Sequence, residues 1–380
     1  MKGTKGTGVL REKNKREILS IIRHVKKTTR QDLVKKMKVS KNTVSLIVDE
    51  LISNNFIKEV GIKTPREKGR PKQIIELNRD GYRSIGIAID KDYIEYVVIN
   101  YYGEIIEKET YDFNCQDPIK TKTEMISLLN RLKRKYDHIL GVGIAIPGIV
   151  NNEEKIVYKS VRLGWENFSI GELDDQNIPV FIQNNVNMSA LSAVEKEEDF
   201  QTGGSFYYVH ISNGVGGAYI TNKQVMNGVS WTAGEIGHIS VDPQGELCIC
   251  GQKGCLEQLI SISSFKRVLT KEGYLPASVN AILDSEDYLH SQKVKEIIHE
   301  FGEYLGRALV PVIHLLNPNQ IIIDNPYAVF DEFEKGCMSY IQQNALEIPF
   351  KKTKVTFGRS SYRKSHGAGL CAIINYERFV

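Results

Sequence analysis

Four potential metal ligands lie close together in the sequence, at His238, Cys248, Cys250 and Cys255. One neutral imidazole and three thiolates form a complete tetrahedral ligand set for a structural Zn²⁺ ion. The alternative interpretation is three buried free cysteines and an unrelated core histidine. The whole chain has only 6 cysteines in 380 residues, so half of them at ligand spacing beside a histidine favours a zinc site.

The residues around these ligands match a family pattern. Gly251 and Gly254 allow the sharp backbone turns that a loop around an ion requires. The segments Gly234–His238 and Cys248–Glu257 read Gly-Glu-Ile-Gly-His and Cys-Ile-Cys-Gly-Gln-Lys-Gly-Cys-Leu-Glu. Together they resemble the ROK family (repressors, open reading frames and sugar kinases), whose members carry Glu-Ile-Gly-His followed by Cys-x-Cys-Gly-x-x-Gly-Cys-x-Glu. The resemblance extends over nearly the whole chain.

The bulk composition is that of a large globular protein. A chain of 380 residues with 41% hydrophobic content is long enough for more than one domain. Residues 1–8 lack the apolar segment of a secretory leader, and the longest apolar stretch, Ile139–Val150, is too short to span a bilayer. We therefore expect a cytoplasmic protein with no membrane association. Cys115, Cys337 and Cys371 lie far apart, as expected of reduced thiols.

Charge is distributed unevenly along the chain. Residues 1–80 hold 21 Lys or Arg and 9 Asp or Glu, a net of +12, whereas the remaining residues have a net charge of −8. This asymmetry indicates a nucleic-acid-binding module joined to a mildly acidic body. A solvated lysine-rich surface would give the same counts, so the pattern of the residues must decide.

Apolar periodicity in the basic segment predicts three helices. They are Lys13–His24, Arg30–Met37 with Thr29 as N-cap, and Lys41–Ser53 with Ser40 as N-cap. Two strands, 56–60 and 73–77, follow as a hairpin with a basic loop between them. The order predicts a winged helix-turn-helix over residues 1–80, whose third helix enters the DNA major groove. A three-helix module for protein interaction is the alternative.

The basic loop of the hairpin ends in Lys68-Gly69-Arg70-Pro71. It resembles the Gly-Arg-Pro element that ROK repressors carry between wing and body, and an extended Arg suits a narrow minor groove. A flexible linker is the competing interpretation. Asparagine, lysine and hydroxyl side chains at the start of a recognition helix can contact bases and phosphates. The predicted DNA-contacting residues are Arg30, Ser40, Lys41, Asn42, Thr43, Ser45 and Arg70.

Strand and helix patterns alternate from Tyr82 to the C-terminus. We expect three antiparallel strands (84–90, 93–99 and 104–111), a helix near 120–134, strands at 139–146 and 180–183, and a helix from Val186. A second group comprises strands 206–211, 216–221 and 321–323, a long helix near 293–316 and a closing helix from Gly367. The resemblance implies a two-lobed, RNase H-like, actin-like α/β fold over residues 81–380. Lobe one is expected at about 81–186 with 366–380, and lobe two, with the zinc site, at about 187–365.

Three of the four elements that ROK kinases use on ATP and sugar are altered. The Asp-x-Gly-Gly-Thr element is Asp90-Lys-Asp here, and the late Gly-Gly element is replaced by Asp324-Asn-Pro, whose carboxylate would repel phosphate. Only the Gly-rich turn at 213–217 is retained. Family kinases have an Asp general base where this chain has Asn185, and an amide cannot accept the proton. We therefore predict no enzymatic activity and no catalytic residues.

Sugar recognition does not require the general base. The resemblance implies a sugar site formed by Asn184, Asn185, Glu235, His238 and Glu257, whose amides and carboxylates suit hydroxyl groups. Pro147-Gly148 and Gly164-Trp165 are expected to line the same cleft, and Arg162 replaces the Asn more often found before Leu-Gly-Trp. Alternatively, Glu235 and Glu257 only support the zinc loop.

These features predict a sugar-responsive transcriptional repressor that binds operator DNA as a homodimer or dimer of dimers. A sugar that favours a closed lobe arrangement would move the DNA-binding modules out of register, and structural Zn²⁺ would hold the sugar-binding loop. The linker and the altered nucleotide elements are most similar to those of xylose repressors of Gram-positive bacteria, which implies D-xylose as inducer. Glucose, N-acetylglucosamine or another sugar is also compatible. Two other functions remain open: a sugar kinase with an accessory DNA-binding domain, and a regulator that responds to a protein such as a sugar-transport component.

Overall fold

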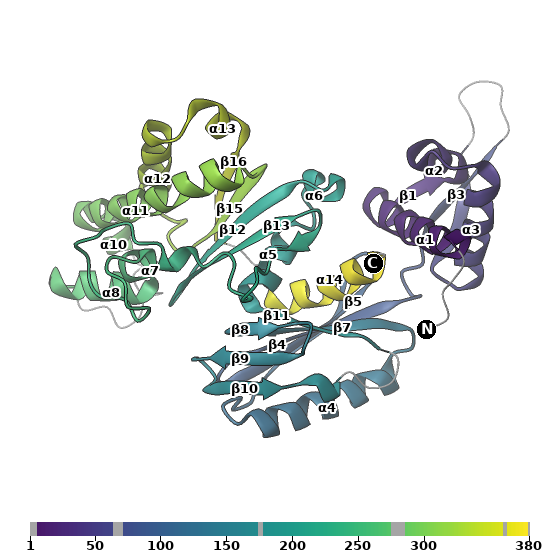
Figure 1. Cartoon of the computed structure of the whole chain (residues 1–380), viewed down its shortest axis with the longest axis horizontal. Helices are drawn as coiled ribbons and strands as arrows, with labels where there is room; N and C mark the ends of the chain where they lie inside the picture. Colours follow the sequence, from purple (N-terminus) through teal and green to yellow (C-terminus); the bar gives the residue numbers. More distant parts are fainter. Residues whose placement is uncertain (1–5, 64–70, 174–177, 275–285, 360–362, 379–380) are drawn as a thin grey trace. The chain divides into compact units, whose positions relative to one another are not determined.

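The computed structural model describes residues 6–63, 71–173, 178–274, 286–359 and 363–378 (Figure 1). The chain divides into two compact units. One comprises Met1–Ser192 with Arg363–Val380, and the other comprises Ala193–Tyr362. The observed class, a helical N-terminal module followed by two mixed α/β lobes, confirms the predicted fold class.

The first unit begins with a helical module and a small sheet. Its elements are α1 (Gly6–Val25), β1 (Lys27–Thr29), α2 (Arg30–Met37), α3 (Lys41–Ser53), β2 (Ile57–Lys63) and β3 (Lys72–Leu77). The sheet order is β1-β3-β2, and both pairs are antiparallel. This is the element order of a winged helix-turn-helix. Helix α1 begins at Gly6, seven positions earlier than the predicted Lys13.

Local hydrogen bonds explain why α2 and α3 begin where the sequence predicts. The backbone N–H of Asp32 donates to Oγ1 of Thr29 at 3.3 Å, and the N–H of Thr43 donates to Oγ of Ser40 at 3.1 Å. Each cap satisfies one of the backbone N–H groups that a helix start leaves without a partner. The apolar periodicity that predicted α3 corresponds to its buried residues, Val44, Ile47, Val48 and Leu51.

The rest of the first unit is built on a five-stranded mixed sheet of order β11-β7-β4-β5-β6. The strands are β4 (Arg83–Ile89), β5 (Tyr93–Asn100), β6 (Ile105–Asp112), β7 (Ile139–Ile146) and β11 (Val180–Asn184). Strands β4, β7 and β11 are parallel, and β4, β5 and β6 form the predicted antiparallel meander. Because the parallel strands end at the same edge of the sheet, Asp90, Pro147 and Asn184 lie at or just beyond that edge.

Two helices cover this sheet, α4 (Pro118–Lys135) and α14 (Lys364–Glu377). Ile85 and Ile87 of β4 pack with Met125 and Leu128 of α4. Helix α14 packs on β4, β5 and β7 (Figure 1). A smaller sheet, which the sequence did not predict, is made of β8 (Ile149–Asn151), β9 (Ile156–Ser160) and β10 (Trp165–Ser169) in the order β10-β9-β8.

Helix α14 approaches β7 so closely that only glycine fits at position 143. A Cβ atom on Gly143 would lie 1.9 Å from the carbonyl oxygen of Ala368 in α14. The substitution Gly143→Ala should therefore destabilise the first unit by about 3 kcal/mol, because backbone atoms would have to move apart. Urea unfolding followed by circular dichroism measures the change. The matched control Gly171→Ala, whose Cβ would have no neighbour closer than 3.5 Å, should change stability by less than about 1 kcal/mol.

The second unit has its own five-stranded sheet, of order β14-β13-β12-β15-β16. The strands are β12 (Ser205–Ile211), β13 (Val215–Thr221), β14 (Gln224–Val225), β15 (Gln320–Asp324) and β16 (Lys354–Gly358). Its longer helices are α8 (Ile262–Lys271), α11 (Gln292–Leu316) and α12 (Asp331–Asn344), with the short helices α6 (Glu198–Thr202), α7 (Leu256–Ile260), α10 (Glu286–His290) and α13 (Glu347–Lys352). Helix α5 (Asn185–Val194) follows β11 and runs from the first unit into the second.

Most of the predicted strands and helices are present with bounds within a few residues. The closing helix starts at Lys364, three positions before the predicted Gly367, and the predicted helix from Val186 starts at Asn185. Within the described residues, none of the helices combines the length and the hydropathy needed to cross a membrane.

Candidate functional site

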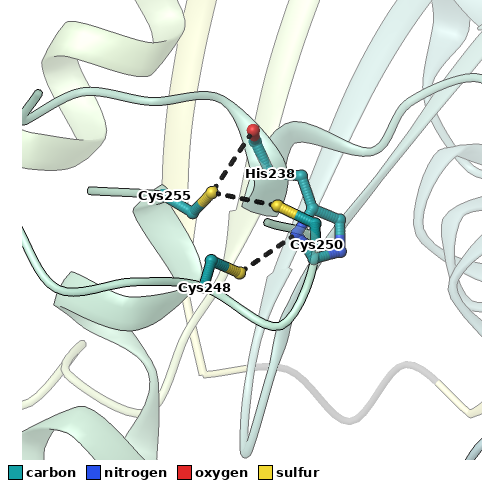
Figure 2. Close-up of side chains that lie close together, drawn as sticks. All are labelled: His238, Cys248, Cys250 and Cys255. Atoms are coloured by element: carbon teal, nitrogen blue, oxygen red, sulfur yellow. Dashed lines mark hydrogen bonds between the residues drawn. The ribbon is translucent and has the colours of Figure 1, made fainter. Parts of the chain in front are cut away.

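The four predicted metal ligands come together in the second unit. His238 ends the short 3₁₀ helix η2 (Ile236–His238), and Cys255 directly precedes α7, while Cys248 and Cys250 lie in the loop between them. Figure 2 shows the four side chains directed toward one another. Their ligand atoms all lie within 4.8 Å of each other.

The distances between these atoms fit a tetrahedral ion. Sγ of Cys250 lies 3.5 Å from Sγ of Cys255, and Sγ of Cys248 lies 3.6 Å from Nδ1 of His238. In a tetrahedral zinc site with Zn–S of about 2.3 Å, two sulfurs are about 3.8 Å apart and a sulfur and a nitrogen about 3.6 Å apart. The cluster is therefore consistent with a zinc site, and the predicted ligand set fits the structure.

The loop geometry is fixed by a glycine beside the cluster. Gly254 has a φ of +64°, and a Cβ there would lie 1.5 Å from the carbonyl oxygen of Asp242. The N–H groups of Val241 and Asp242 both donate to the Gly254 carbonyl, which holds the two ends of the loop together. Only glycine meets both demands, so the sequence Gly254-Cys255 places the last thiol against His238.

The thiols differ in acidity in the absence of an ion. The backbone N–H of Gln252 lowers the pKa of Cys250 to about 7, whereas burial raises the pKa of Cys255 to about 12. At neutral pH, Cys255 is therefore a thiol unless a cation replaces its proton. This is the behaviour expected of a metal ligand whose binding releases a proton.

Two of the predicted sugar-binding carboxylates lie next to this cluster along the chain. Glu235 precedes η2, and Glu257 lies in α7, where its Oε2 accepts the backbone N–H of Val215 at 3.0 Å. Desolvation raises the pKa of Glu235; the charge of His238 opposes this shift, and the charge of Glu257 adds to it. Metal-site formation would thus position both carboxylates, since each is within three residues of a ligand.

The other two predicted sugar-binding residues belong to the first unit. Nδ2 of Asn184 donates to the carbonyl of Gly148 at 2.8 Å, and its Oδ1 accepts the N–H of Val186 at 2.7 Å. Asn185 is the first residue of α5 and is partly buried. The amide of Asn184 is therefore held by local bonds at the carboxyl edge of the sheet.

Two carboxylates occupy positions where the resemblance implies nucleotide-binding elements in kinases. Asp90 accepts a short hydrogen bond from Nε of Arg162, and Nζ of Lys364 lies 3.3 Å from its Oδ2. Burial opposes ionisation of Asp90, but the Arg162 hydrogen bond and the Lys364 charge outweigh it and lower the pKa. In the second unit, Asp324 accepts hydrogen bonds from Tyr208 Oη at 2.7 Å and from His210 Nδ1 at 3.0 Å.

The pairing of Arg162 with Asp90 was not predicted from the sequence. The only signal was that Arg162 departs from the family residue at its position. The two residues are far apart in the chain, and the sheet topology is needed to bring them together.

The predicted DNA-contacting residues lie at the start of α3 and in α2. Ser40, Lys41 and Asn42 are exposed, and Thr43 and Ser45 are partly exposed. Arg30 is engaged by acidic neighbours: its Nη1 lies 2.8 Å from Asp49 Oδ1 and its Nη2 lies 3.2 Å from Glu59 Oε1. Arg70 falls outside the described residues. The assignment of these side chains to DNA stays a prediction.

Comparison with known proteins gives three kinds of match. A sequence model of the ROK family matches residues 84–374. The xylose repressor of Caldicellulosiruptor bescii is 28% identical over 370 residues, which cover 91% of this chain and 92% of that protein. A glucokinase of Halalkalibacterium halodurans is 28% identical over 261 residues, covering 63% of this chain and 78% of the kinase.

A solved structure extends the likeness to the whole fold. A ROK family transcriptional regulator, described as a homologue of the E. coli MLC protein, superposes with a TM-score of 0.81 at 22% identity. The match covers 97% of both chains, so the N-terminal module and both lobes have counterparts there.

Proposed function

The chain belongs to the ROK family, and from this membership we propose that it is a sugar-responsive transcriptional repressor with D-xylose as its inducer. The observation that carries the proposal is the extent of the match to a xylose repressor. That match leaves 9% of 380 residues uncovered, about 34 positions, so more than half of the first 80 residues must lie within it. A likeness of this extent includes more than half of the basic N-terminal segment as well as the family fold that follows it.

Three features favour a receptor over a kinase. Asn185 stands where a kinase of this family has its general base, and general-base catalysis contributes about 10²–10⁴ in rate. Asp90 is engaged by two cations of this chain, Arg162 and Lys364. The third feature is the carboxylate of Asp324, which ends β15 and would repel a nucleotide phosphate near it.

The residues proposed to bind the sugar follow from the family resemblance. In this proposal Glu235 and Glu257 bind hydroxyl groups of the sugar, together with His238, Asn184 and Asn185. The bound zinc would be structural, because its four protein ligands leave no open position for catalysis. Its role would be to fix η2 and α7, and hence both carboxylates, in one arrangement.

DNA binding completes the proposed function. Helix α3 would enter the major groove through its exposed start, and two subunits of a homodimer would contact two half-sites of an operator. A ligand shifts an equilibrium only through its differential affinity for the two states. D-Xylose would therefore bind more tightly to the conformation of the repressor that has low affinity for the operator.

Addition of D-xylose to the full-length, zinc-loaded protein should raise its thermal midpoint and weaken operator binding. At a concentration of 100 times Kd, a ligand stabilises the folded state by about 2.7 kcal/mol. Operator affinity should fall about 5- to 150-fold, the usual range of allosteric coupling. Differential scanning fluorimetry with a pentose and hexose panel and fluorescence anisotropy with operator DNA measure the two effects.

The alternatives predict different outcomes in these two experiments and in an assay for sugar phosphorylation. ATP-dependent phosphorylation of any sugar in the panel, detected by a coupled assay, would identify a kinase. A midpoint shift with another sugar but not with xylose would correct the inducer and leave the repressor role intact. No shift with any sugar, together with intact DNA binding, would favour control by a protein partner.

A further inference from the structure

Leu46 is an exposed leucine on the helix that the proposed function places in the DNA major groove. The residue is 60% exposed, and it lies in the first half of α3 (Lys41–Ser53). The apolar residues of α3 that pack against the module lie on its opposite side. They are Val44, Ile47, Val48 and Leu51, each 1% exposed or less.

The outward side of α3 is otherwise polar. Asn42 precedes Leu46 by one helical turn and is exposed, and Ser45 beside it is partly exposed. Asp49, one turn after Leu46, is also exposed and would repel DNA phosphates. Arg30 lies 2.8 Å from the Asp49 carboxylate and offsets its charge. Leu46 is thus an apolar side chain in the centre of a polar, nearly neutral strip.

The cations around the start of α3 indicate which kind of partner covers this strip. Lys35, Lys36, Lys38 and Lys41 are all exposed, and within the described part of the chain none of them has an ion-pair partner. Other basic residues of the module are paired, such as Arg11 and Lys15, both with Glu50. Unpaired lysines fit a polyanion, whereas a second copy of the same face would be repelled.

The side chain of a leucine limits what it can recognise on DNA. Leucine neither donates nor accepts a hydrogen bond, so it cannot read the donor and acceptor pattern of a base pair. The apolar group that the major groove presents is the C5-methyl of thymine. An exposed leucine on a recognition helix therefore has one favourable contact available on a base edge.

We propose that Leu46 determines operator specificity by packing against the 5-methyl group of a thymine in each half-site. The inference rests on the proposed DNA-binding function and adds a base preference to it. Four helical residues rise about 6 Å, and successive base pairs are about 3.4 Å apart. The thymine should therefore lie within about two base pairs of the position read by Asn42.

The experiment selects binding sites from random duplex DNA with the full-length protein and its variants. Wild type should prefer thymine by at least about fivefold at one position of each half-site. Leu46→Ala should lose this preference and keep the others, whereas the volume-conserving Leu46→Met should retain it. Asn42→Ala should relax a neighbouring position. Leu315→Ala, at a leucine that is 82% exposed in the second unit, is the matched control and should select the wild-type site.

Deoxyuridine then isolates the methyl group. Replacing the selected thymine with deoxyuridine in one half-site removes a single methyl group and should weaken wild-type binding about fourfold. The same replacement should leave the affinity of Leu46→Ala unchanged. Because Leu46 is exposed, the variant should keep the wild-type thermal midpoint, and this is checked first.

The outcomes separate the two levels of the proposal. If wild type selects no DNA sequence, the repressor function itself is wrong. If wild type selects a site and Leu46→Ala selects the same bases with the same response to deoxyuridine, the repressor function stands and the role of Leu46 is wrong.

Discussion

Replacing Cys255 with serine should abolish stoichiometric zinc binding and lower the thermal midpoint of the second unit by about 10 °C or more. Structural zinc contributes about 10–16 kcal/mol of apparent binding free energy in small zinc modules, and this binding is coupled to folding. Loss of a few kcal/mol of stability is enough to lower the midpoint by this amount. Each kcal/mol lost lowers the midpoint by about 2–4 °C in a unit of 150–250 residues. Cys255 is fully buried and precedes α7, so its loss should also displace Glu257 and abolish the sugar response.

Metal content measured by elemental analysis after dialysis tests this prediction, with Cys337→Ala as control. Cys337 is fully buried in the core and is not a ligand in the cluster, so its loss should leave one zinc per chain. The zinc content of the wild type should fall as pH is lowered, because protons compete for the thiolates. Burial raises the pKa of Cys255 to about 12, so zinc must displace the proton of this thiol at neutral pH. A Cys255→Ser protein with full zinc content and an unchanged midpoint would contradict the assignment.

The features that the sequence predicts well are those controlled by local interactions. Helices α2 and α3 have the predicted bounds, and they begin where predicted because Thr29 and Ser40 accept hydrogen bonds from N–H groups three positions later. The metal cluster is also local, since its ligands lie in one loop and its flanking helical turns. Neither of these features depends on contacts between distant segments.

Helix α12 (Asp331–Asn344) shows why another part of the fold was not predicted. It contains Gly336, which normally weakens a helix by about 1 kcal/mol relative to alanine. In the structure this glycine allows α12 to approach α11, because a Cβ there would lie 2.2 Å from the carbonyl oxygen of His299. Tertiary packing therefore outweighs helix propensity, and only the structure reveals it.

The candidate site also has one part that local sequence predicts and another part that depends on tertiary contacts. The zinc ligands and the adjacent glutamates were predicted from two short motifs within residues 234–257. The engagement of Asp90 by Arg162 and Lys364 depends on a strand, a hairpin and the C-terminal helix meeting at one sheet edge. No local pattern encodes that contact.

A buried ion pair joins the helical module to the C-terminal helix, and breaking it should have a large effect. Nε and Nη2 of Arg23 in α1 lie 2.8 Å and 3.1 Å from the two carboxylate oxygens of Glu377 in α14. Both side chains are at most 5% exposed. Arg16, two turns earlier in α1, adds hydrogen bonds from Nη1 to the carbonyls of Tyr376 and Arg378 at the end of α14.

Arg23→Met should destabilise the first unit by about 3–5 kcal/mol, because Glu377 would remain buried without its cation. Glu377→Met should cost a similar amount for the converse reason. The double variant Arg23→Met/Glu377→Met should recover most of the loss, since two apolar side chains of similar length leave no uncompensated charge. Urea unfolding of all four proteins gives the coupling energy directly.

The double variant also distinguishes a buried ion pair from an ion pair at the surface. A surface pair would give single-variant losses below about 1 kcal/mol and no recovery. Large single losses with recovery in the double variant would show that α1 is anchored to α14 through a desolvated contact. In that case the position of α3, which packs on α1, depends on the C-terminal helix whose other end contacts Asp90 at the edge of the sheet.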